Sequence, residues 1–176
     1  MPCVLTGSQP LDCKDAIGGI YEVKVKVHPG LTAIEAYYTI SSGSVTAISS
    51  LGSSLTGWYT YGLEKQTASF KDDPQPSSTN GSLSFNQELK IIINKIAVRM
   101  SNEMRLLGQN RLLFAVRDMN GNRFFMGLKY AMDMTPSTSG SGTARTDRSG
   151  YELTFTGSED LHVQFVSTAI YDTLVS

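Results

Sequence analysis

The sequence is poor in the residues that most enzymes and metal proteins use for chemistry. Its 176 residues include only two cysteines, Cys3 and Cys13, and two histidines, His28 and His162. A metal site needs more ligands than the N-terminal region offers, and a catalytic histidine needs a partner placed by a pocket. We therefore expect no enzyme, no metal and no cofactor, with both histidines in turns or at the surface. The two cysteines either form a disulfide or remain free thiols, the state that a reducing cytosol favours.

An excess of charge of one sign is also missing. Charged residues make up 18% of the chain and the formal net charge is −1. Proteins that bind nucleic acid usually carry a clear basic excess, whereas a nearly neutral chain can approach its own copies closely. The longest apolar runs, 91–93 and 112–116, are too short to cross a membrane. With no basic and apolar leader at its start, the chain is expected to be made in the cytoplasm and to stay soluble.

Three short motifs suggest a functional site at first sight. Asp72-Asp73 and Glu159-Asp160 are paired acids next to turn-forming residues, so we interpret them as solubilising turn residues rather than as an acid–base pair. The segment 118–122 resembles a calcium loop but lacks the downstream glutamate, and its Asn-Gly step predicts a type I′ hairpin turn instead.

The chain is rich in the alternating pattern that is typical of β-strands. From Ile20 to Val27, apolar residues alternate with Glu22, Lys24 and Lys26, which predicts a strand with one buried face and one wet face. Further strands are expected near 37–40, 45–48, 58–61, 111–118, 122–130, 151–156 and 161–166. We predict one mainly β domain over 1–176, a β-sandwich or barrel-like fold with an extended N-terminal arm (1–19), a long hairpin (63–94), one helix (95–107) and a flexible loop (135–150).

The predicted helix has an apolar stripe. Ile96, Met100, Met104 and Leu107 recur at steps of three or four residues, and Gly108 stands where a C-terminal cap glycine is expected.

The long hairpin is the feature that a monomer explains least. We expect a first arm over 63–70, a turn-rich tip over 71–81 and a return arm over 82–94. In the return arm, an apolar face that includes Leu83 and Phe85 alternates with a polar face. A strand of about a dozen residues reaches roughly 40 Å and would be an aggregation hazard if left bare. Either a neighbour's strand covers it, or it bends across its own sandwich.

The order of these parts resembles the tail tube proteins of tailed bacteriophages, in which a long hairpin, one helix and a second hairpin follow one another. At the level of residues, the chain is also similar to small virion structural proteins of phages that infect Bacteroidetes-type bacteria. The matching pieces are 13–20 (CKDAIGGI), 118–122 (DMNGN) and 149–159 (SGYELTFTGSE).

This resemblance implies a virion tail protein that forms hexameric rings, which stack into a tube for the genome. Its partners would be copies of itself, other tail proteins and genomic DNA that passes without specific binding, with no membrane. The subunit contacts expected on this basis are Phe70, Leu83, Phe85, Ile17 and Ile20. The residues expected to face the lumen are Ser84, Asn86, Glu88 and Lys90.

Two alternatives remain open at this point. The chain is a head-to-tail connector, a tail terminator, a hub or a capsid decoration protein if it closes an assembly once. It is a carbohydrate-binding adhesion module if Trp58, Tyr59 and Tyr61 form a stacking platform for sugars.

Overall fold

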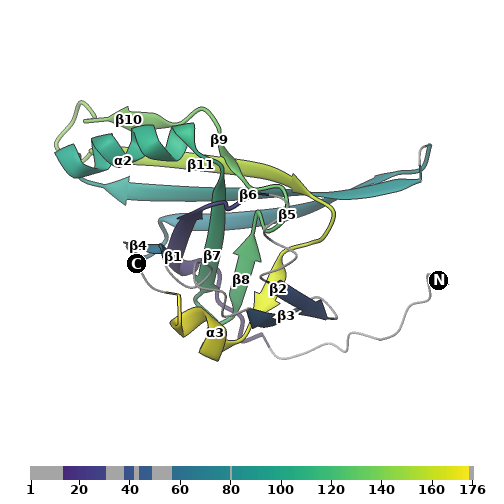
Figure 1. The fold of residues 1–176 in the computed structure, drawn as a ribbon. Coiled ribbons are helices and arrows are strands. Elements are labelled where there is room, and N and C mark those ends of the chain that lie inside the picture. Colours follow the sequence, from purple (N-terminus) through teal and green to yellow (C-terminus); the bar gives the residue numbers. More distant parts are fainter. Residues whose placement is uncertain (1–13, 31–37, 42–43, 49–56, 80, 175–176) are drawn as a thin grey trace.

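The computed structural model describes residues 14–30, 38–41, 44–48, 57–79 and 81–174, and it shows a mainly β protein, as predicted (Figure 1). Sheet A has seven strands in the order β2-β3-β12-β8-β7-β1-β4, and sheet B has the order β10-β11-β6-β5 with β9 paired to β11. All described pairs are antiparallel except β12 with β3. The elements are β1 (Ile20–Val27), β2 (Tyr38–Ser41), β3 (Ser44–Ile48), β4 (Tyr59–Gly62), β5 (Ala68–Ser77), β6 (Ser82–Asn94), α2 (Val98–Gln109), β7 (Leu112–Asp118), β8 (Arg123–Met126), β9 (Asp133–Met134), β10 (Thr138–Gly140), β11 (Gly150–Glu159), β12 (Gln164–Val166) and α3 (Thr168–Asp172).

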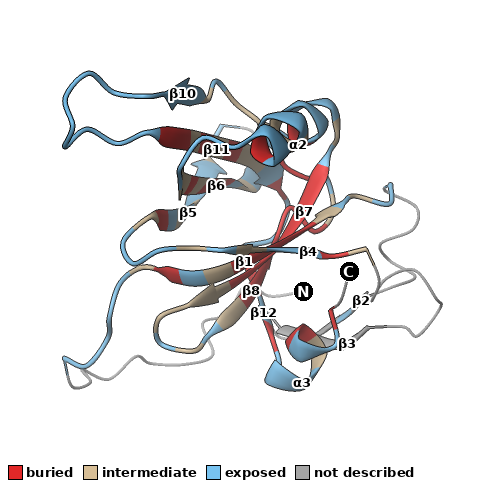
Figure 2. Cartoon of the chain, turned by 90° about the vertical axis from the view of Figure 1, so that its left-hand side faces the viewer, coloured by how far each residue is buried: buried red, intermediate tan, exposed pale blue. Residues whose placement is uncertain are grey.

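The two sheets share a hydrophobic core. Sheet B lies above sheet A in Figure 2, and buried residues line the facing strands. Val23 of β1 and Val116 of β7 are fully buried and belong to the same cluster as Leu89 of β6. The Phe114 and Phe155 rings, one from each sheet, lie 4.8 Å apart between their centroids. This packing is the sandwich that alternation along the strands predicts.

Sheet A is also buried on its other face, which the sequence did not reveal. The C-terminal helix α3 covers this face, and Trp58, Phe125 and Tyr171 pack there in a second apolar cluster. Lys24 was expected to face water but is 9% exposed. Its Nζ donates hydrogen bonds to the carbonyl oxygens of Tyr171 and Leu174, each at 3.1 Å. Lys24 therefore fastens the C-terminal segment to the sheet.

The predicted helix is present but starts later and ends later. α2 spans Val98–Gln109, and its Met100 and Leu107 are buried. Gly108 lies inside the helix, so its expected role as the cap was wrong. Asn110 ends the helix instead, and its Nδ2 donates to the Leu106 carbonyl oxygen at 2.8 Å, which satisfies one of the orphan carbonyls of the last turn.

Two connections differ from the prediction. In the turn between β7 and β8, only Gly121 has a positive φ, of 86°, and its N–H donates to the Asp118 carbonyl oxygen at 3.3 Å. This is a type I turn followed by a left-handed glycine, not a type I′ turn. The Asp118 carboxylate accepts from the Asn122 N–H at 2.7 Å, so it stabilises the turn. The segment 135–150, expected as a loop, contains the strand β10.

Candidate assembly interface

The hairpin β5–β6 extends beyond the rest of sheet B. β11 accompanies β6 from Asn94 only as far as Phe85. From that pair outward, residues 74–77 and 82–85 form a two-stranded ribbon that projects from the body (Figure 1), and β11 does not accompany it beyond Phe85. The hairpin was predicted, but its tip was not. Residues 71–77 belong to β5, and β6 begins at Ser82.

β6 is therefore not the bare strand that the sequence suggested. β11 pairs with one of its edges and β5 with the other along most of its length. Within the described residues, the long free edge of sheet B belongs to β5. In the hairpin β5–β6, the parts left without a neighbouring strand are this edge and the projecting ribbon. The projecting ribbon is defined as residues 74–77 and 82–85.

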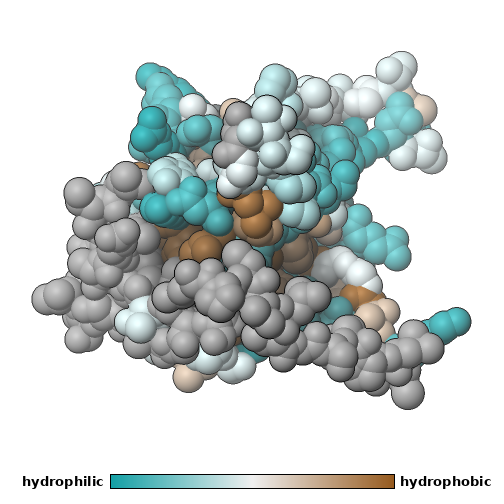
Figure 3. Space-filling model, turned by 90° about the vertical axis from the view of Figure 1, so that its right-hand side faces the viewer, coloured by the Kyte–Doolittle hydropathy of each residue, from teal (hydrophilic) through white to brown (hydrophobic). Residues whose placement is uncertain are grey.

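One face of the projecting ribbon is apolar. Pro74 lies opposite Phe85, and Pro76 lies opposite Leu83. Both prolines are exposed and Leu83 is 54% exposed. Phe85 is half-buried, with its ring centroid 6.1 Å from that of His162. Figure 3, which views the molecule from the end where the ribbon projects, shows hydrophobic side chains exposed near the centre of that face.

The free edge of β5 is protected where the ribbon projects. The Ile92 N–H donates to the Thr67 carbonyl oxygen at 2.7 Å, so odd-numbered residues of β5 bond to β6 and even-numbered ones direct their backbone groups outward. Pro74 and Pro76 are even-numbered and have no N–H to offer. A neighbouring strand cannot complete a hydrogen-bonded ladder along this edge. The outer edge of β5 is therefore closed to strand addition at the ribbon, and the apolar face of the ribbon remains exposed.

The four residues expected to face a lumen lie on the polar face of sheet B. Ser84, Asn86, Glu88 and Lys90 occupy the alternate positions of β6, opposite to the buried Gln87, Leu89 and Ile91. Lys90 forms an ion pair with Glu152 of β11. Glu152 also pairs with Arg148 at 2.8 Å, and the hydrogen bond from Lys90, followed by the one from Arg148, lowers the pKa of Glu152. Positive and negative groups thus alternate on this face.

A polar hollow of about 460 Å³ lies on the same face. Asp73, Asn86, Glu88 and Ser158 contribute oxygen atoms to its lining. No group of three or more His, Cys, Asp or Glu side chains that could hold a metal ion occurs among the described residues. The hollow is an open polar depression over strands β5, β6 and β11.

The five expected contact residues do not all reach the surface. Ile20 is 2% exposed and belongs to the core between the sheets, so its assignment to a subunit contact was wrong. Phe70 is half-buried against the same core, with its ring 5.3 Å from that of Phe124. Ile17 is 64% exposed, and its backbone N–H and carbonyl each form a 2.8 Å hydrogen bond with the Asn120 side chain. Of the expected contact residues, Leu83 and Ile17 are exposed and Phe85 is partly exposed, so these three could still contact another subunit.

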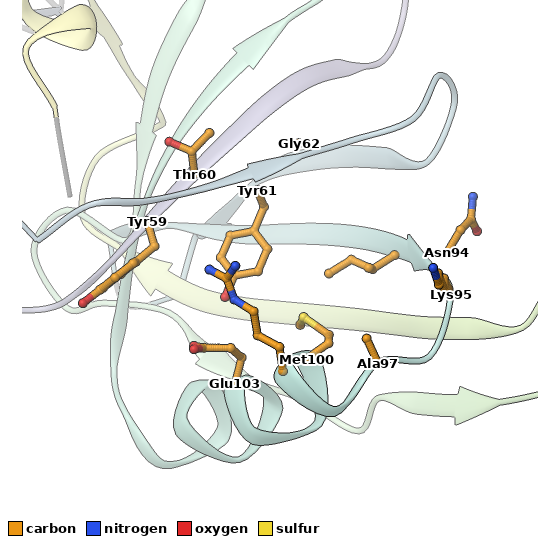
Figure 4. Close-up of a pocket in the computed structure, with 11 residues that line it drawn as sticks. Tyr59, Thr60, Tyr61, Gly62, Asn94, Lys95, Ala97, Met100 and Glu103 are labelled. Atoms are coloured by element: carbon orange, nitrogen blue, oxygen red, sulfur yellow. The ribbon is translucent and has the colours of Figure 1, made fainter.

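A groove between β4 and α2 is a second apolar surface, which the sequence reading missed. Figure 4 shows Tyr59 and Tyr61 on β4 and Met100 and Glu103 on the facing side of α2. One part of the groove has a volume of about 370 Å³ and reaches from Tyr59 to Asn94. An adjoining part of about 230 Å³ includes Tyr59 and Tyr61 together with residues from β1, α2 and β7. No sequence motif marks the groove, because its walls come from segments far apart in the chain.

The groove has a mixed electrostatic character. Burial, then the nearby Glu103 carboxylate, raise the pKa of Tyr61 to about 12, with Arg99 opposing them. Three cations, Lys26, Lys95 and Arg99, line the two parts of the groove together with the single carboxylate of Glu103. The sugar-stacking platform of the alternative reading is not formed, since Trp58 is 1% exposed and packs under sheet A.

No helix among the residues that the structure describes is long and apolar enough to span a membrane. No family model, curated protein or solved structure matches the chain. Its fold is mainly β, and its surface combines a projecting ribbon with an apolar face and a distant apolar groove.

Proposed function

We propose that this chain is a virion structural protein that assembles with copies of itself. It would be a tail tube protomer whose rings, hexamers by the resemblance, stack into a conduit for DNA. The observation that carries the proposal is the projecting ribbon. A two-stranded ribbon is marginally stable alone in water. Here Leu83 and the two prolines leave its apolar face uncovered. A second protomer would supply the missing cover.

The polar face of sheet B supports the same proposal. Lys71 and Lys90 are interspersed with Asp73, Glu88 and Glu152, and Lys90 is held in an ion pair. A basic stripe would bind phosphates and release counterions, whereas a surface of alternating charge lets DNA pass. On this proposal, sheet B lines the conduit, the protein resides in the virion tail, and its partners are its own copies and other tail proteins.

Electron microscopy of the purified full-length chain tests the proposal directly. We expect rings and stacked tubes whose fraction rises with protein concentration. Sedimentation velocity on the same samples measures the species in solution. Monomers that persist at high concentration contradict self-assembly. Single rings that never stack favour a connector, terminator, hub or decoration role for the same fold.

A further inference from the structure

One polar side chain of the turn between β7 and β8 holds the N-terminal segment to the body of the protein. The Asn120 amide bonds the backbone of Ile17 twice. The Ile17 N–H donates to Oδ1, and Nδ2 donates to the Ile17 carbonyl oxygen, each at 2.8 Å. Residues 14–18 are exposed, and these two are the hydrogen bonds that join them to the rest of the described structure. We name this contact the Asn120 latch.

The latch depends on an amide and cannot be formed by a carboxylate. Nδ2 of Asn120 also donates to Oδ2 of Asp118 at 3.3 Å. The Asp118 carboxylate is held in place by the N–H and the side-chain amide of Asn122. An aspartate at position 120 would have no donor for the Ile17 carbonyl oxygen, and it would place a second negative charge beside Asp118. Both effects open the latch.

The residue that follows makes this amide chemically vulnerable. Asparagine loses its amide most readily before glycine, because glycine has no side chain to hinder its own backbone nitrogen, and Asn120 is followed by Gly121. Asn120 is exposed, and no atom lies within 4 Å of the position where a Cβ of Gly121 would stand. The Gly121 N–H donates to the Asp118 carbonyl oxygen over a long 3.3 Å. The nitrogen that must react is therefore neither crowded nor tightly bound.

Deamidation at this step needs only water as a co-reactant. The Gly121 backbone nitrogen loses its proton and attacks Cγ of Asn120, which closes a succinimide ring. The bond from Cγ to Nδ2 breaks, and Nδ2 leaves with that proton as ammonia. Water then opens the ring, adding its hydroxyl to one carbonyl carbon and its remaining hydrogen to the ring nitrogen. Opening at Cγ yields aspartate, and opening at the backbone carbonyl yields isoaspartate.

We propose that Asn120 is a site of spontaneous deamidation and that the reaction releases residues 14–18 from the body. In the closed latch, hydrogen bonds to Ile17 and Asp118 hold the amide in place, so the reaction proceeds from the open state, which local fluctuations populate. The carboxylate that forms prevents the latch from closing again. The turn thus acts as a one-way release for the N-terminal segment.

Peptide mapping tests the reaction. The folded full-length protein is aged in mildly alkaline buffer, and mass spectrometry detects the exchange of the amide NH2 for OH. We expect aspartate and isoaspartate at position 120 and none at Asn102, which is also exposed but precedes glutamate. Mapping separates Asn120 from the other Asn-Gly step, at 80–81. An Asn120 that stays intact as long as Asn102 overturns the proposal.

Hydrogen exchange of the Ile17 amide, measured by NMR, tests the release. We expect this amide to exchange at least about 10-fold faster in Asn120→Asp than in wild-type, because the hydrogen bonds of the latch no longer form. The matched control Asn102→Asp makes the same change at an exposed position of α2 and should leave the exchange rate as it is. Wild-type protein aged until Asn120 has converted gives the same comparison without a substitution. If Ile17 stays equally protected in Asn120→Asp and in the aged protein, no release occurs and the proposal is wrong.

Discussion

Replacing Leu83 by aspartate should weaken assembly roughly 100-fold while leaving the fold of the protomer intact. Leu83 is 54% exposed, so about half of its side chain is still to be buried in a complex. Fully burying a leucine contributes about 1.5–3 kcal/mol, which leaves roughly 1–1.5 kcal/mol for the contact. The variant loses this contribution, and a carboxylate buried without a partner costs about 1–3 kcal/mol more. The total, about 3 kcal/mol, corresponds to roughly a 100-fold weaker contact.

The protomer itself should hardly change, because substitutions at exposed sites usually alter the free energy of unfolding by less than about 0.5 kcal/mol. Gln75→Asp is the matched control, since Gln75 lies on the opposite face of the same ribbon and is exposed. Sedimentation velocity over a range of concentrations measures assembly, and urea denaturation measures stability. Unchanged assembly of Leu83→Asp, or an equal loss in Gln75→Asp, would refute the argument that the apolar face makes the contact.

Three further predictions concern the protomer. Lys24→Ala leaves two carbonyl oxygens of the C-terminal segment without their donor and should lower the free energy of unfolding in urea by about 2–3 kcal/mol, whereas exposed Lys65→Ala should change it little. Gly150→Ala places a Cβ 2.2 Å from the Ile93 carbonyl oxygen and should destabilise the fold by at least about 2 kcal/mol, while Gly140→Ala, with no atom within 4 Å, should be tolerated. Burial raises the pKa of Glu159 above its ordinary value of 4.5, and the hydrogen bonds from the Tyr130 and Lys129 N–H groups oppose this effect. The folded state therefore holds the Glu159 proton more tightly than the unfolded state, and stability should fall as pH rises from 4.5 through the raised pKa. Glu159→Gln should remove the Glu159 contribution to the dependence of the melting temperature on pH, measured in thermal melts at several pH values.

The alternation of apolar and polar residues predicted much of the fold, because each strand of a sandwich has one face toward the core and repeats with a period of two residues. The strand Ile20–Val27 was expected at its observed bounds. Its faces were assigned less well. A β-bulge between Ile20 and Glu22 shifts the register against β7, so Ile20 points into the core and Tyr21 is 54% exposed. A bulge leaves no clear signal in the sequence, so alternation along Ile20–Val27 did not show that Ile20 is buried.

Tertiary cover explains the other errors. The alternating pattern of β1 places Lys24 on the solvent face, but in the structure α3 packs over that face. The sequence gives no sign of α3, because its five residues are too few for a recognisable helical period. The prolines of β5 were read as part of a turn, although an edge strand tolerates proline where the N–H points outward. For the candidate interface, alternation identified the faces of β6 correctly. The groove was out of reach of sequence reasoning, because β4, α2 and β1 meet only in the folded chain.

The same two prolines make the ribbon selective. A bare strand edge is a general template that pairs with almost any extended backbone, and for this reason natural proteins protect their edges. Pro74 and Pro76 close the outer edge of β5 to such pairing, yet they add to the apolar face beside Leu83 and Phe85. On the proposed function, the contact with another copy would therefore depend on side chains more than on backbone hydrogen bonds. A ribbon built in this way keeps its apolar face exposed without offering the outer edge of β5 as a template for growth of the sheet.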